Sequence, residues 1–303
     1  MQWVRVWLVS VCTMCAFGAQ AKLNVFTCEP EWAALATEIG GDRVKVYSAT
    51  TARQDAHRVQ AKPSLIAKMR QADLVVCTGA ELEVGWLPLL LQKGGNRNVF
   101  PGNPGHLEMA DEIELIGKKD HVDRSMGDVH AEGNPHLQLD PDRMAQAASV
   151  LHQRLVRLAP EHQAQFNAAH DDFSARWSAA TARWKAQRDS MEPLKLVVYH
   201  ANWDYLAEWW GWSIVGSLEP KPGIPPSTAH LKALLGDVKT HGPDAVVYSA
   251  YQSDKPARWL GGQLDVPVFK LLSTVDDWDQ PNALIRWYDT VIEPFAQLGA
   301  GAN

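Results

Sequence analysis

The sequence has few cysteines and no run of basic residues. Only 4 of its 303 residues are Cys, and 29 Lys and Arg residues are scattered among 35 Asp and Glu residues, giving a formal net charge of −6. Nucleic-acid-binding proteins usually carry clustered basic residues, often interleaved with aromatic ones. The sequence lacks such clusters, so we do not expect nucleic acid as a partner. Low-complexity segments are also absent, and 46% hydrophobic residues predict a globular protein.

A long hydrophobic run is missing from the N-terminus. The apolar stretch at 6–17 is shorter than the about 20 residues that a membrane anchor needs. It follows an arginine and precedes Ala19-Gln20-Ala21, the small-x-small pattern that signal peptidase recognises. We therefore expect residues 1–21 to be a signal peptide and the mature chain to be exported.

Two of the cysteines lie in the predicted signal peptide and two in the mature chain. Cys12 and Cys15 lie inside the predicted signal peptide, and neither follows the small residues of a lipid-attachment site, which favours a soluble exported protein over a lipoprotein. Cys28 and Cys77 stay in the mature chain, each at the end of a short strand-like pattern. An oxidising compartment favours a disulfide between them, and two buried thiols are the alternative.

Strand-like and helix-like patterns alternate in both halves of the mature chain. In the first half, strands are expected at "LNVFTC", "VKVYSAT" and "DLVVC", with helices between them at "PEWAALATEIGGD" and "KPSLIAKMRQA". The same alternation resumes after Pro193, from the strand "LKLVVYH" to a final helix through "ALIRWYDTVIEPFAQL". Such alternation predicts α/β lobes, each a parallel sheet covered by helices.

The segment between these halves lacks strand signals. A helix is expected from Pro141 up to an interruption at Ala159-Pro160, followed by a longer helix without Gly or Pro. One face of this second helix would carry its aromatic residues, Phe166, Phe173, Trp177 and Trp184. We expect a rigid connecting helix at 160–192 between an N-terminal lobe at 22–159 and a C-terminal lobe at 193–303.

Three of the 11 histidines occupy positions typical of binding sites. His57 follows one expected strand, His200 ends another, and His136 lies in the loop "GNPHLQLDP" before a helix. Ligands of parallel sheets bind at the carboxyl ends of strands, so a site between the lobes is expected. Zinc favours imidazole ligands from separate segments, although no HExxH or zinc-finger pattern is present. The remaining histidines, including His106 and His162, are expected at the surface.

The chain resembles the periplasmic metal-binding proteins of bacterial ABC transporters, the cluster A-I proteins that carry zinc or manganese. The resemblance runs from about residue 22 to the C-terminus and rests on "EIGGDRVKVYS", "QDAHRVQAKPS", "QADLVVCTGAELEVGWL", "NPHLQLDP" and "YHANWDYLAEWWG". It implies two similar α/β lobes joined by a long rigid helix, with metal in the cleft. It also implies delivery of the metal to a permease in the inner membrane.

The same resemblance implies that His57, His136 and His200 are metal ligands. Manganese-type members tend to have a carboxylate where this chain has His200, so three histidines favour Zn²⁺ over Mn²⁺. The family's fourth ligand is an Asp after the last strand. Here Asp276 is the expected residue, with Asp277 or water as alternatives.

His130 lies in a loop that is His-rich in zinc-type relatives, and it is considered as an auxiliary ligand. The mature protein is expected to be a periplasmic monomer and not an enzyme, and a periplasmic metallochaperone is a candidate second partner.

Two other functions fit parts of the sequence. Three histidines with an open fourth position also describe a zinc hydrolase, although no convincing general base accompanies them. The tryptophans of "ANWDYLAEWWGW" could stack on an organic solute in a solute receptor or adhesin, although such residues on an amphipathic helix usually form a core.

Overall fold

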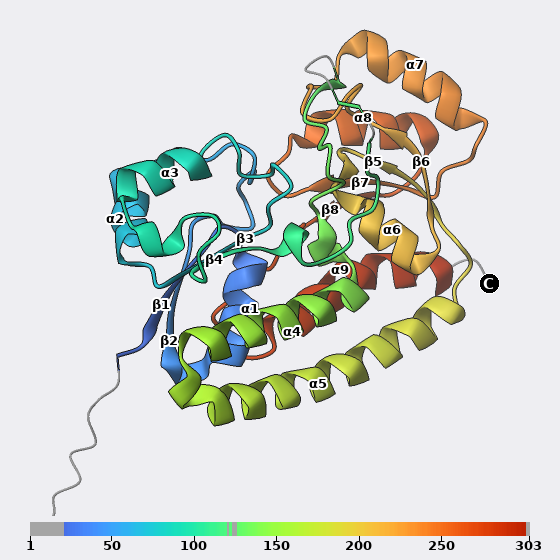
Figure 1. Ribbon diagram of the computed structural model, residues 1–303. Helices are drawn as coiled ribbons and strands as arrows, with labels where there is room; N and C mark the ends of the chain where they lie inside the picture. Colours follow the sequence, from blue (N-terminus) through green and yellow to red (C-terminus); the bar gives the residue numbers. More distant parts are fainter. Residues whose placement is uncertain (1–20, 120, 123–125, 301–303) are drawn as a thin grey trace, which may run out of the picture.

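The computed structural model describes residues 21–119, 121–122 and 126–300, and it contains two four-stranded parallel sheets (Figure 1). The predicted signal peptide, 1–21, lies almost wholly outside the described residues. The first sheet has the order β2-β1-β3-β4 and is formed by Leu23–Thr27 (β1), Val44–Ser48 (β2), Leu74–Cys77 (β3) and His106–Glu108 (β4). The second has the order β6-β5-β7-β8 and is formed by Lys195–Val198 (β5), Ser213–Ser217 (β6), Ala245–Ser249 (β7) and Val268–Leu271 (β8). The equivalent orders confirm the prediction of two similar α/β lobes.

Helices cover both faces of each sheet. In the N-terminal lobe these are Pro30–Gly40 (α1), Pro63–Gln71 (α2) and Leu87–Gly94 (α3), and each has a proline in its first turn, where the missing N–H has no intrahelical role. The C-terminal lobe has Asp204–Trp210 (α6), Thr228–Lys239 (α7), Asp254–Leu264 (α8) and Ala283–Ala300 (α9). In the described part of the chain, no helix is long and apolar enough to cross a membrane.

Two helices join the lobes. Pro141–Leu158 (α4) ends just before the predicted interruption, and Gln163–Asp189 (α5) then runs for 27 residues along one side of the molecule (Figure 1). Helix α5 packs against α1, α4 and α9, elements of both halves of the chain. The four aromatic residues predicted to share one face are all buried: Phe166, Phe173, Trp177 and Trp184. A helix packed along its length in this way is a stiff connection.

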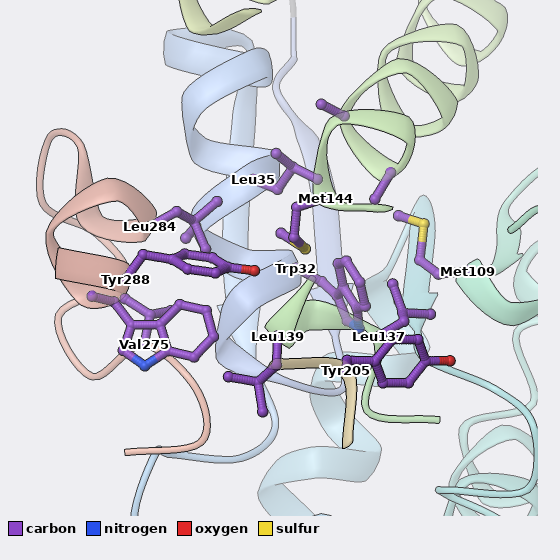
Figure 2. Close-up of a cluster of buried hydrophobic side chains, with 14 of the residues drawn as sticks. Trp32, Leu35, Met109, Leu137, Leu139, Met144, Tyr205, Val275, Leu284 and Tyr288 are labelled. Carbon is purple, nitrogen blue, oxygen red and sulfur yellow. The ribbon is translucent and has the colours of Figure 1, made fainter. Parts of the chain in front are cut away.

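A continuous apolar core extends from one lobe into the other. Figure 2 shows part of it, where Trp32 of α1 and Met144 of α4 lie near Tyr288 of α9 and Tyr205 of α6. The Tyr288 hydroxyl also donates to the backbone carbonyl of Gln138. A large apolar interface of this kind restricts the motion of one lobe against the other.

Cys28 and Cys77 form a disulfide at the ends of β1 and β3, with their Cα atoms 4.8 Å apart. The two strands are hydrogen-bonded neighbours, which explains the proximity. The pairing confirms the disulfide expected in an oxidising compartment.

One strand was not expected from the sequence, and two histidines expected at the surface are buried. The sequence patterns did not reveal β4, because its three residues are too few for a period to be recognised. His106 and His162 are buried and not on the surface. His106 lies in β4, where its ring contacts the Val99 carbonyl and the Glu108 carboxylate at 2.9 Å each.

Candidate metal centre

The fold brings His57, His136 and His200 together between the lobes. Each residue offers one ring nitrogen, and these three nitrogens lie within 4.8 Å of one another. The ring centroids are 5.5–5.6 Å apart, and the rings meet edge to face. His57 follows β2 and His200 follows β5, so each sheet contributes a ligand candidate near the carboxyl end of a strand.

His136 is held by a short, well-defined loop. It follows Pro135, and its backbone N–H donates to the Asn134 side chain at 3.0 Å. Just beyond it, Asp140 caps α4 by accepting from the backbone N–H groups of Asp142 and Arg143 at 2.8 and 3.0 Å. These contacts fix the loop that carries His136.

The ring of His136 carries a nitrogen that lacks a partner. Its Nε2 atom is buried and makes no hydrogen bond to any described residue. Burial, followed by the nearby His200 and His57, lowers the pKa of His136 well below its ordinary value. A neutral imidazole with an unused buried lone pair is the state that a metal ion requires of a ligand.

The rings of His57 and His200 each contact a carboxylate through the Nδ1 atom. His57 Nδ1 lies 2.9 Å from Asp55 Oδ1, and His200 Nδ1 lies 2.7 Å from Glu219 Oε2. Burial alone would raise the pKa of Asp55, but the hydrogen bond and the charge of His57 outweigh it and lower that pKa. Neither carboxylate was expected from the sequence. Asp55 could have been suspected from its position two residues before His57, whereas Glu219 gave no signal.

His130, considered from the sequence as an auxiliary ligand, lies beside His57. Its Nε2 atom is 3.4 Å from His57 Nε2, with the ring centroids 5.5 Å apart. Burial, and secondly the neighbouring His57, lowers the pKa of His130 to about 4. Its imidazole is therefore neutral at pH 7 and adds a fourth nitrogen near the cluster.

The structure does not bring Asp276 into this group. The chain after β8 passes the cleft before it reaches Asp276. There the Ser273 carbonyl accepts from the Gln138 side chain at 3.1 Å, and the Thr274 hydroxyl donates to Glu31. Val275 is then buried in the core, and the Asp276 carboxylate pairs with Arg53. Asp276 and Asp277 line a separate hollow against α9.

Buried carboxyl groups surround a small cavity that adjoins the histidines. Glu29 and Glu31 line it together with His57 and His136. Burial raises the pKa of Glu31 to about 7 and that of Glu29 well above its ordinary value. Glu83, whose oxygens accept from the backbone N–H groups of residues 78 and 79, also has its pKa raised to about 7 by burial.

Two lobes, a rigid connecting helix and a cluster of imidazoles in the cleft define a protein that binds a metal ion between its lobes. The profile of the family described as "Zinc-uptake complex component A periplasmic" matches residues 25–296. The chain therefore belongs to this family of periplasmic metal-binding proteins of ABC transporters. The family consists of transport proteins that bind a substrate and not of enzymes, so the hydrolase alternative is excluded.

Curated relatives include proteins named for either metal. The high-affinity zinc uptake system protein ZnuA of Yersinia pestis is 24% identical over 213 residues, 66% of each chain. The manganese ABC transporter substrate-binding lipoprotein scaA of Streptococcus gordonii is 22% identical over 272 residues, 85% of this chain and 81% of its own.

Solved structures show the same fold. A crystal structure of ZnuA has a TM-score of 0.75 and 22% identity, and the match covers 92% of this chain and 99% of the other. A manganese-bound mutant of the periplasmic metal-binding protein from Candidatus Liberibacter asiaticus has a TM-score of 0.74 and 18% identity, with 92% and 100% covered.

Proposed function

We propose that this protein captures Zn²⁺ in the periplasm through His57, His136 and His200 and delivers it to an ABC-type permease in the inner membrane for import. The unpartnered Nε2 of His136, buried where the three rings converge, is the observation that carries the proposal. Export would depend on the predicted signal peptide at 1–21, and membership of a periplasmic transport family supports both the compartment and the permease.

The donor atoms favour zinc over manganese. Imidazole nitrogen suits Zn²⁺, whereas Mn²⁺ prefers carboxylate, carbonyl and water oxygens. The nearby carboxylates of Asp55, Glu219 and Asp276 are already engaged by His57, His200 and Arg53, respectively. The atoms that converge there are the ring nitrogens of His57, His136 and His200.

The fourth ligand has two protein candidates. Proximity favours His130, because its Nε2 atom already lies 3.4 Å from that of His57. Asp276, the residue expected from the sequence, would have to leave Arg53 to reach the metal. Water can fill the position if neither side chain binds.

Competitive titration of the chelator-stripped mature protein with Zn²⁺ and Mn²⁺ tests the proposal. We expect one tight zinc site per chain and much weaker manganese binding. His136→Ala should weaken zinc binding by more than the roughly 10–100-fold typical when only a hydrogen-bond partner of a ligand is lost. His241→Ala, at an exposed position in the C-terminal lobe, is the matched control.

Two results would contradict the zinc proposal. Zinc binding that is unchanged in His136→Ala would remove the histidine centre from the mechanism. Tighter binding of Mn²⁺ than of Zn²⁺ would instead support the manganese function for which some relatives are named.

A further inference from the structure

We propose that Glu219 is a positioning residue that fixes the tautomer of His200 and thereby strengthens the preference for Zn²⁺ over Mn²⁺. The inference rests on the proposed function, since it concerns the same metal centre.

Glu219 is held in place by its own loop. Its Oε2 atom accepts a hydrogen bond from the backbone N–H of Gly223 at 2.9 Å and lies 2.7 Å from His200 Nδ1. The side chains of Glu219 and His200 are only 10% and 7% exposed. Gly223 has a φ of +75°, a conformation that glycine adopts without strain, so the loop can bring its N–H to the carboxylate. The two hydrogen bonds and the burial of both side chains hold the carboxylate against the His200 ring.

The contact determines which nitrogen of His200 carries the proton. Glu219 Oε2 is an acceptor in its contact with the Gly223 N–H, and in the contact with His200 the Nδ1–H group is the matching donor. In the neutral ring, Nε2 then keeps its lone pair and can bind a metal ion together with the rings of His57 and His136. Without Glu219, the ring could adopt the other tautomer, which would place a proton on the ligating atom.

The same contact influences the choice of metal. A carboxylate that accepts from the far nitrogen makes imidazole a stronger donor, which benefits a nitrogen-preferring ion such as zinc. Glu219 Oε2 already accepts from two N–H groups, which makes this oxygen less available as the ligand that manganese would favour. Asp55 contacts His57 in a similar way, but it also lies 3.9 Å from Arg58, so Glu219 gives the cleaner test.

The test compares Glu219→Ala and Glu219→Gln with Glu208→Ala, a control at an exposed position in α6. Nitrogen NMR of the metal-free proteins reports the tautomer of His200. We expect the Nδ1–H form in the wild type and in Glu219→Gln, whose amide oxygen can still accept, and its loss in Glu219→Ala. Zinc affinity should fall roughly 10–100-fold in Glu219→Ala. Manganese affinity should fall by a smaller factor, and Glu219→Gln should recover part of the zinc affinity.

Two outcomes would overturn the inference: an unchanged His200 tautomer in Glu219→Ala, or equal losses of zinc and manganese affinity, as a merely loosened fold would produce. These outcomes differ from failure of the proposed function. A wild-type protein without tight zinc binding would contradict that function, whereas tight binding with an unaltered zinc-to-manganese ratio in Glu219→Ala would contradict the inference alone.

Discussion

The Nε2 atoms of His57 and His130 lie 3.4 Å apart, although the residues are 73 positions apart in the sequence. Two imidazoles at this distance can share one proton, or both lone pairs can bind one cation. The contact makes His130 the nearest additional nitrogen donor to the three-histidine cluster.

We expect His130→Ala to weaken zinc binding about tenfold or more, at the lower end of the range for groups that support a metal site. Asp276→Ala should have a smaller effect, because its carboxylate pairs with Arg53. Competitive titration with a chelator measures both, with His241→Ala as the control. The reverse order of effects would show that Asp276 leaves Arg53 and completes the site.

Glu31→Gln should stabilise the metal-free protein at pH 8. Burial raises the pKa of Glu31 from 4.5 to about 7, so the unfolded chain loses this proton at lower pH than the folded chain. This contribution to stability is complete below pH 4.5, declines as the pH rises towards 7, and is then lost. Linkage gives roughly 3 kcal/mol for the full effect.

The free energy of unfolding, measured with denaturant at pH 5 and pH 8, tests this. Glutamine can still accept from the Thr274 hydroxyl, so the gain at pH 8 should exceed the gain at pH 5. Glu192→Gln, at an exposed position, should change neither value. A Glu31→Gln protein that is no more stable than the wild type at pH 8 would refute the assignment.

Removal of the Cys28–Cys77 disulfide should destabilise the protein by about 2–4 kcal/mol, because the crosslink restricts the unfolded chain. The bond spans 49 positions of the sequence. The double variant Cys28→Ala/Cys77→Ala can be compared with the wild type by denaturant unfolding with and without a reducing agent. The reductant should lower the stability of the wild type only. Equal sensitivity of both proteins would mean that the disulfide is not the cause.

Gly223→Ala should accelerate zinc release. A Cβ atom at Gly223 would collide with the carboxylate of Asp128, which must then move. We expect this movement to disturb the segment that carries His130, two residues further along the chain. Gly242→Ala is a matched control, since Gly242 also has a positive φ, +60°, but no described atom lies within 4 Å of its added Cβ. Stopped-flow mixing with a chelator measures the rates. Equal acceleration in both variants would assign the effect to backbone strain alone.

The two-lobe architecture and the three-histidine candidate followed from local patterns and a family resemblance in the amino-acid sequence. Apolar periodicity records which face of each strand and helix is buried, so local patterns sufficed for β1, β5 and the break before α5. His57 and His200 could be selected because strand ends in parallel sheets are binding positions irrespective of side-chain detail. His136 was selected from its loop before a helix and from the family resemblance.

The surroundings of those histidines depend on how distant segments pack together in the fold. Glu219 reaches His200 from the end of a neighbouring strand, and His130 reaches His57 across a long loop, contacts that no sequence period encodes. Asp276 was expected in the cleft because it follows β8, but the pairing with Arg53 and the burial of Val275 direct it elsewhere. Periodicity reports burial along one element, whereas a metal centre depends on side-chain directions from several elements at once.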